Sequence, residues 1–163
     1  MLLLVMEITF LSRQEPITFQ IKQPKIEFSN VTFEKLDAIL ITPERIKARL
    51  KADKALVYKD RNELYDINAT LHFDDHDDWL QAQKAVYRPD EICLIGDILY
   101  DSNHTLLFKS DDLVYNTRTD IAVSPTPFVL QKDGSTAEGK TMRYDAKTRH
   151  VTAEYVQFMI EEE

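Results

Sequence analysis

The chain has 163 residues, of which 44% are apolar and 29% charged, and its formal net charge is −8. This length and composition suit one folded domain with a sizeable core and exclude a largely disordered chain. The negative charge argues against nucleic acid and against simple docking on anionic lipid headgroups, because both need clustered positive charge. The single cysteine, Cys93, excludes an intrachain disulfide and lies in an apolar run, where a buried free thiol is expected.

Residues 1–11 are apolar except for Glu7 and Thr9. The run is shorter than the roughly 20 residues that span a bilayer, and it lacks the positive start and the cleavage site of a signal peptide. We therefore predict a short apolar segment over residues 1–15 and one domain over residues 16–163. The segment is read as a truncated membrane anchor, a first strand or an interfacial segment, and the anchor is preferred.

The next segments alternate between apolar and polar residues, which is typical of half-buried strands. The clearest is residues 46–52, where Ile46, Ala48, Leu50 and Ala52 alternate with basic residues. Good helix formers over residues 44–50 leave a helix as the alternative. We predict a strand, because the alternation is strict.

The densest polar stretch is His72–Asp78, with four carboxylates and two imidazoles. Hard cations prefer carboxylate oxygens, so this stretch is one candidate for a metal site. Its carboxylates lack the spacing of a calcium-binding loop, however. We therefore predict a solvated connection between two strands and no metal site.

Four tyrosines, Tyr58, Tyr87, Tyr115 and Tyr144, recur at spacings of 29, 28 and 29 residues. An apolar residue stands two positions before each, and a small residue stands five positions before the last three. A short polar run follows each tyrosine, as in Tyr144–Arg149, and then apolar residues return. A fixed period in this range indicates a stack of one repeated unit. Each unit is predicted to be a strand, a four-residue turn and a strand, so that the fold class is all-β with stacked antiparallel hairpins.

Two further signals mark turns in the carboxyl-terminal part. Lys132–Ser135 contains an Asp-Gly pair that is typical of a hairpin turn. Pro125 and Pro127 bracket one residue, and proline is tolerated in sheets only at edges, strand starts and bulges. We expect the chain to kink or to change sheet between them.

The chain contains no nucleophile elbow, phosphate-binding loop or pair of cysteines. His104 and His150 are isolated among polar neighbours, where an ordinary surface histidine is expected. We therefore predict no catalytic residue, no cofactor and no enzymatic activity.

The apolar inner face is the remaining working surface. If the interior were an open slot, large residues would line it. Its wall would be thinned by the small residues Ala52, Ala82, Ser110 and Gly139. Alternation cannot distinguish such a slot from a filled interior, and by itself it favours a packed core. A filled stack that acts as a protein-interaction scaffold therefore stays open as the alternative function.

Several stretches together resemble a known family: residues 46–55 leading to Tyr58, residues 113–119, residues 124–130 and residues 137–148. Over about residues 24–160 they are similar to LptC, the inner-membrane-anchored periplasmic component of lipopolysaccharide export in Gram-negative bacteria. The stretch Arg49–Asp53 favours LptC over the related soluble bridge protein LptA. Residues 1–11 depart from the family pattern, which carries a full transmembrane helix at its start.

The resemblance implies an open, twisted β-jellyroll that holds the acyl chains of lipid A in an apolar slot. It also implies a periplasmic location, lipid received from an inner-membrane ABC transporter at the amino-terminal edge, and transfer to an LptA-like protein at the carboxyl-terminal edge, residues 149–160. The residues expected to bind lipid are Phe33, Leu50, Phe73, Leu99, Phe128, Met142 and Phe158. The residues expected to bind the partner are Val151, Ala153, Tyr155 and Gln157.

Overall fold

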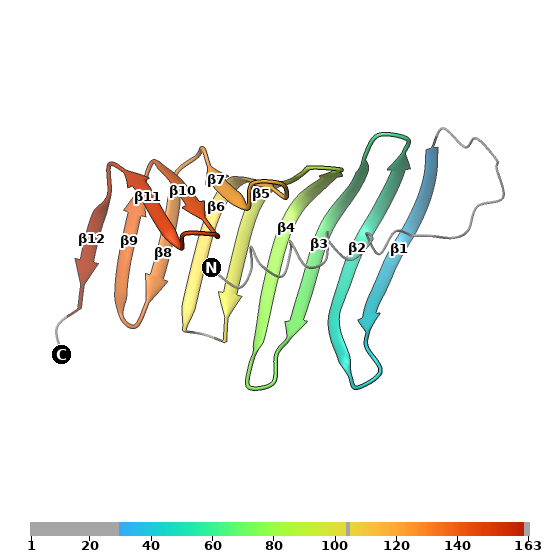
Figure 1. Cartoon of the computed structure of the whole chain (residues 1–163), viewed down its shortest axis with the longest axis horizontal. Coiled ribbons are helices and arrows are strands. Elements are labelled where there is room, and N and C mark those ends of the chain that lie inside the picture. Colours follow the sequence, from blue (N-terminus) through green and yellow to red (C-terminus); the bar gives the residue numbers. More distant parts are fainter. Residues whose placement is uncertain (1–29, 104, 162–163) are drawn as a thin grey trace.

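The computed structural model describes residues 30–103 and 105–161, which form one antiparallel sheet of twelve strands (Figure 1). Six long strands come first, and each pairs with the next in a simple meander. They are β1 (Asn30–Ile41), β2 (Ile46–Tyr58), β3 (Asn62–His72), β4 (Asp77–Arg88), β5 (Glu91–Ser102) and β6 (Leu106–Asn116). The all-β prediction is confirmed, and so is the strand over residues 46–52, because β2 pairs with β1 on one side and β3 on the other.

After β6 the sheet divides into two branches. The end of β6, Val114–Asn116, pairs with β7, whereas its first part, Leu106–Ser110, pairs with β8. One branch continues from β7 to β10 and β11, and the other from β8 to β9 and β12. Figure 1 shows β7, β10 and β11 folded over the row of strands that β8, β9 and β12 continue. The short strands are β7 (Ile121–Ser124), β8 (Phe128–Lys132), β9 (Ser135–Gly139), β10 (Thr141–Asp145), β11 (His150–Glu154) and β12 (Gln157–Ile160).

The chain passes from one branch to the other at three places. Pro125–Pro127 separate β7 from β8, as the paired prolines predicted. Lys140 separates β9 from β10, and Tyr155, with φ of 55°, lies at the break between β11 and β12. The predicted carboxyl-terminal edge, residues 149–160, therefore consists of two strands in different branches.

The backbone of the long strands is irregular near their middles, at the level where the sheet divides into its two branches. Lys35, Asp66 and Asp97 have positive φ there, and aspartate tolerates this conformation better than most residues. Between β4 and β6, β5 carries one extra residue near Gly96–Asp97 relative to each neighbour, so the pairing register shifts on both sides. Such bulges bend a strand and increase its twist. The long strands therefore bend along the line where the carboxyl-terminal half divides.

Three of the four repeated tyrosines occupy equivalent positions. Tyr87, Tyr115 and Tyr144 lie in one cross-strand row, which passes through Ile92 and Ala122. Tyr58 lies outside it, because Val57 takes the equivalent position in β2. The repeat spacing therefore located the turns, although Tyr58 is one residue away from the position equivalent to the other three tyrosines. The predicted turn length of four residues is confirmed after Tyr115 and Tyr144 and is wrong after Tyr58 and Tyr87, where the turns have three and two residues.

The predicted hairpin at Lys132–Ser135 is present between β8 and β9. Its two central residues, Asp133 and Gly134, have φ of 50° and 78°. Positive φ at both central residues is the property of the two-residue turn that matches strand twist. No helix in the described ranges is long and apolar enough to cross a bilayer. The segment 1–15 and the start of the predicted domain at residue 16 lie outside the described residues.

Candidate functional site

The inner face of the bent sheet is a continuous apolar surface. Directly paired residues share a face, so a cross-strand row can be followed through Ala55, Leu64, Ala85, Leu94 and Leu113, which are all buried. These residues belong to one contiguous cluster that extends from β2 to β10. The face therefore crosses the whole sheet without interruption.

Large and small residues alternate along the bend of this face, with one residue from each strand. The directly paired members are Leu36 with Ala52, Ile67 with Ala82, Ile98 with Ser110, and Phe128 with Gly139. A Cβ atom on Gly139 would lie 2.6 Å from the Phe128 ring, so the glycine leaves the space that this ring fills. The repeated small residues thus accommodate large neighbours on the inside of the bend.

Polar contacts hold the point where the two branches separate. The Ser110 and Ser124 hydroxyls lie 2.7 Å apart, and Ser124 is fully buried. The Thr126 hydroxyl accepts a hydrogen bond from the backbone N–H of Asp112 at 3.0 Å. These contacts satisfy the polar groups that the break in β6 pairing exposes.

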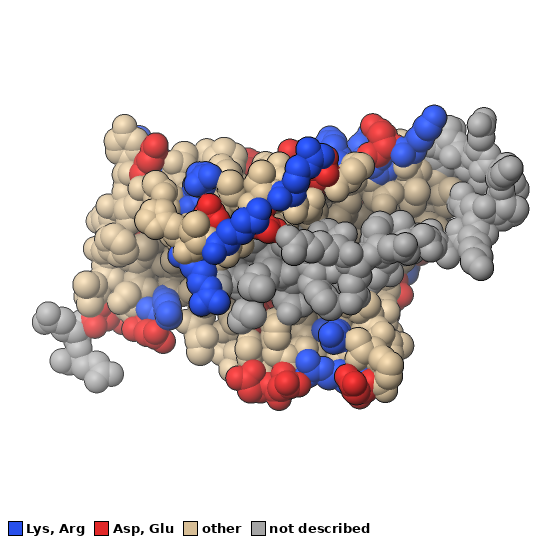
Figure 2. All heavy atoms as spheres, in the orientation of Figure 1, with Lys and Arg blue, Asp and Glu red and all other residues tan. Residues whose placement is uncertain are grey.

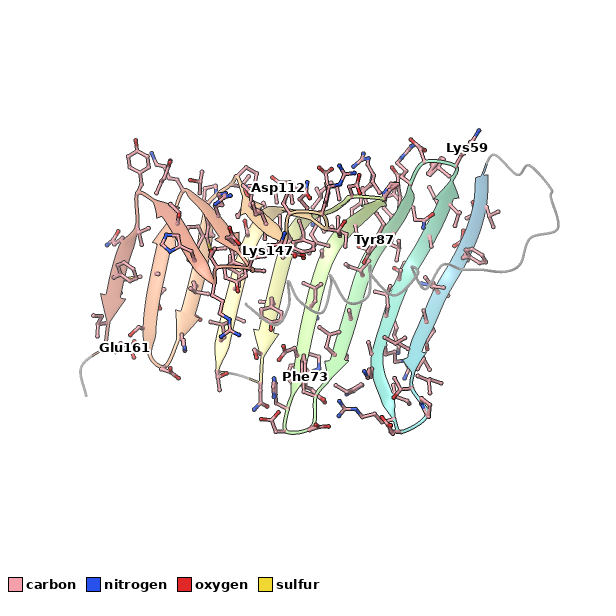
Figure 3. All side chains as sticks on the ribbon, viewed as in Figure 1. Lys59, Phe73, Tyr87, Asp112, Lys147 and Glu161 are labelled. Carbon is pink, nitrogen blue, oxygen red and sulfur yellow. The ribbon has the colours of Figure 1, made fainter. Side chains whose placement is uncertain are left out.

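Five of the seven residues predicted to bind lipid belong to the inner core. Phe128 and Met142 are buried in it, and Phe33, Leu50 and Phe73 are partly buried and pack against it. Figure 3 shows Phe73 near the β3–β4 turn, toward the opposite end of the strands from Tyr87.

Phe158 and Leu99 lie elsewhere. Phe158 pairs with the buried Ala137, so it shares the inner face, but it stands on edge strand β12 and is 70% exposed. Leu99 does not belong to the inner core. Its neighbours Ile98 and Tyr100 are buried in the core, so Leu99 faces the outer side of the sheet. Residues 98–100 are all apolar, and a run without alternation does not reveal which face is buried.

The His72–Asp78 stretch spans the β3–β4 turn, residues 73–76, and Asp74 and Asp75 are exposed there, as a solvated connection requires. Figure 2 shows acidic side chains gathered at this turn. No group of three or more acidic, histidine or cysteine side chains in the described ranges is arranged to hold a metal ion.

Asp78 departs from that prediction, because its side chain is fully buried. The carboxylate accepts hydrogen bonds from the Tyr100 hydroxyl at 2.5 Å and from the Ser102 hydroxyl at 2.7 Å. Its other neighbour is the His76 Nε2 atom at 3.5 Å. Burial and the bond to Asp78 raise the pKa of Tyr100 above its ordinary value. Nothing in the local sequence indicated that the Asp78 carboxylate is buried, since the hydroxyls that donate hydrogen bonds to it come from β5.

The carboxyl-terminal edge exposes apolar side chains. Val151 lies on edge strand β11 and pairs with Tyr144 on the inner face, yet it is 47% exposed. On edge strand β12, Phe158 and Ile160 are also exposed. The inner apolar face thus reaches the edge of the sheet and is uncovered there. Among the predicted partner residues, Ala153 is half-buried, Tyr155 lies exposed at the break between the edge strands, and Gln157 is exposed and pairs with Glu138.

At the opposite edge, β1 pairs only with β2 among the described strands. Ile41 and Ile46 are paired across the β1–β2 turn and are both exposed. Among the described strands, three edges, those of β1, β11 and β12, are therefore unpaired and bound one apolar face. A closed barrel would have no such edges.

The family model described as "Lipopolysaccharide-assembly, LptC-related" matches residues 1–153. The chain belongs to the LptC family. This confirms the resemblance seen in the sequence and assigns the protein a role in lipopolysaccharide transport. No curated protein matches the chain significantly in sequence.

The fold of this LptC-family chain is shared by a solved structure. It is similar to that of LptH from Pseudomonas aeruginosa, described as the LptA homologous periplasmic component of the conserved lipopolysaccharide transport device. The TM-score is 0.56 at 14% sequence identity, and the match covers 71% of this chain and 95% of LptH. At this identity the likeness establishes the fold, and the open jellyroll prediction is confirmed.

Proposed function

We propose that this protein binds the acyl chains of lipid A on its inner apolar face and passes lipopolysaccharide to an LptA-like protein across the β11 and β12 edge. The observation that carries the proposal is the apolar face that runs from β2 to the carboxyl-terminal edge, where Val151, Phe158 and Ile160 are exposed. Burial of one methylene contributes about 0.8 kcal/mol, so apolar contact alone can retain several acyl chains. The acyl chains then occupy the apolar face, and the lipid phosphates lie at its margin.

The edges supply the partner contacts in this proposal. An unpaired strand is a template for a strand of another protein, and main-chain hydrogen bonds then continue the sheet. The β11 and β12 edges receive the LptA-like protein, and the β1 edge faces the inner-membrane ABC transporter. The protein acts in the periplasm, anchored to the inner membrane by its amino-terminal segment, and performs no chemistry of its own.

The filled scaffold remains the second candidate, because the inner side chains already form a buried cluster. Photocrosslinking distinguishes the two functions. Leu130 and Val129 are adjacent on β8 and are both half-buried, but only Leu130 packs against the inner core. A photoreactive residue at position 130 is expected to capture lipopolysaccharide, and the matched residue at position 129 is not.

A second matched pair tests the same face at the other end of the sheet. Leu50 packs against the core and its neighbour Lys51 is exposed. Adducts at 50 and 130 but not at 51 and 129 would support lipid transport. A folded protein without adducts at 50 and 130 would support the scaffold. Equal adducts on both faces would indicate nonspecific adsorption.

The edge is tested separately by Phe158→Glu. This side chain is exposed, so the substitution leaves the buried cluster intact. We expect it to reduce capture of an LptA-like protein while lipid adducts at position 130 persist. Unchanged capture would rule out β12 as part of the docking edge.

A further inference from the structure

Two turns of the repeat are built in the same way. They follow Tyr115 and Tyr144, which are 29 residues apart, and join β6 to β7 and β10 to β11. In the first, the Asn116 side chain accepts hydrogen bonds from two backbone N–H groups of its turn, both at 3.0 Å. In the second, the Asp145 side chain does the same at 3.0 and 3.2 Å.

The residue five positions after each tyrosine is also equivalent. Asp120 has φ of 59° and Arg149 has φ of 58°. The Tyr115 hydroxyl donates a hydrogen bond to the Asp120 carboxylate at 2.9 Å. Arg149 has no acceptor group on its side chain, so it cannot take this role for Tyr144.

The Tyr144 hydroxyl is accordingly unsatisfied. The Tyr144 side chain is 1% exposed. Among the buried side-chain oxygen and nitrogen atoms of residues 30–103 and 105–161, its hydroxyl is the one without a hydrogen-bond partner. Leaving a buried hydroxyl unpaired is unfavourable, and native proteins rarely do so without a reason. A ligand oxygen would satisfy it.

The turn that follows Tyr144 carries two basic residues, Lys147 and Arg149. In the earlier turn Arg118 pairs with Asp90 at 2.6 Å. The equivalent Lys147 and the neighbouring Arg149 have no acidic partner in the described part of the chain. Burial raises the pKa of Tyr144, the Arg149 charge opposes that rise, and the Asp145 charge adds to it. Arg149 occupies the turn position that Asp120, which contacts the Tyr115 hydroxyl, has in the earlier turn. Figure 2 shows basic side chains around the turn between β10 and β11, and Figure 3 labels Lys147 there.

We propose that the Tyr144 hydroxyl and the Arg149 guanidinium together bind a phosphate monoester of the transported lipid. The inference rests on the proposed transport function and adds a headgroup site to it. The hydroxyl donates to one phosphate oxygen, and the guanidinium donates to one or two others in the planar geometry that suits phosphate. Because β11 is an edge strand, the headgroup is held where the apolar face opens toward the partner.

The test compares bisphosphorylated lipid A with chemically dephosphorylated lipid A, both bound to the purified protein. We expect the wild type to bind the phosphorylated lipid roughly tenfold more tightly, as one charge-assisted contact provides. Tyr144→Phe and Arg149→Gln should each remove most of this preference and leave affinity for the dephosphorylated lipid unchanged. Arg118→Gln is the matched control and should retain the preference.

Arg149→Asp is a second variant, which recreates the arrangement of the earlier turn. It should give the Tyr144 hydroxyl an acceptor, raise Tm by about 2–4 °C and abolish the phosphate preference. Inorganic phosphate serves as the third probe, and competition only at millimolar concentration is expected. Micromolar competition without any lipid preference would instead assign the site to a free anion.

The possible failures are distinct. If the wild type and all variants bind both lipids equally well, the phosphate site is overturned and lipid binding stands. If the folded wild type binds neither lipid, the transport proposal and the headgroup site are both overturned.

Discussion

Gly139→Ala tests the large-and-small packing along the bend. The added Cβ atom would lie 2.6 and 2.8 Å from two carbons of the Phe128 ring and 3.2 Å from the Glu154 carbonyl oxygen. Carbon atoms are in favourable contact at about 3.5–4.0 Å, so the ring must move by about 1 Å. Phe128 is 4% exposed and stacks on Phe108, which leaves it little space to move.

The expected loss of stability follows from two opposing effects. Overpacking a core destabilises by about 1–3 kcal/mol, and replacing glycine where φ is ordinary stabilises by about 0.4–1 kcal/mol. Gly139 does not have positive φ, so the second effect applies. The net expectation is a loss of about 1–2 kcal/mol in the free energy of unfolding, or roughly 2–8 °C in Tm.

Urea unfolding followed by Trp79 fluorescence measures this change. Phe128→Leu removes the clash, so the double variant should lose less stability than the sum of the two single variants, by about 0.5 kcal/mol or more. Gly134→Asn is a control, because nothing lies within 4 Å of a Cβ at that turn and asparagine tolerates its φ of 78°. If Gly139→Ala were as stable as the wild type, or additive with Phe128→Leu, the packing argument would be refuted.

Three other measurements address single groups. Tyr100→Phe removes a donor from the buried Asp78 carboxylate, and the free energy of unfolding should fall by about 1–3 kcal/mol in denaturant titration. Cys93 is half-buried, and this partial burial raises its pKa to about 11. Iodoacetamide at pH 8 should therefore alkylate it roughly 100-fold more slowly than in the unfolded chain, and an equal rate would contradict the raised pKa. Backbone N–H donors lower the pKa of Asp145, so its contribution to stability is complete above the unfolded value of 3.8 and is lost as pH falls through the lower folded value. Asp145→Asn should keep the turn, because Asn116 makes the same hydrogen bonds in the earlier turn. Any difference in the free energy of unfolding between the wild type and this variant should shrink between pH 5 and about pH 2. A difference independent of pH would exclude the carboxylate as its source.

Much of the architecture could be read from local patterns. Strict alternation over residues 46–52 predicted β2, the Asp-Gly pair predicted the β8–β9 turn, and Pro125 with Pro127 predicted the change of branch. These features depend on neighbours in the chain, where side-chain period and backbone preference act directly. The tyrosine spacing located the turns for the same reason.

The candidate site was predicted less completely. The inner positions of Phe33, Leu50, Phe73, Phe128 and Met142 agree with the lining that the sequence suggested. The position of Leu99 does not agree with that lining. Leu99 stands in an apolar run, so only the pairing of β5 with β6 decides which of its residues face inward. Asp78 was missed because an acidic turn is normally solvated, and its hydrogen-bond donors are more than 20 residues away.

The sequence by itself determined an all-β chain of repeated hairpins, the places of its main turns, and its membership of a lipopolysaccharide-transport family. Only the tertiary structure decided which side of each strand faces inward, since pairing register is set between strands and a shift of one residue reverses every side chain. The same long-range pairing satisfied the Tyr115 hydroxyl and left the Tyr144 hydroxyl without a partner. Equivalent sequences can thus acquire different chemistry, because a buried polar group depends on atoms that folding brings to it.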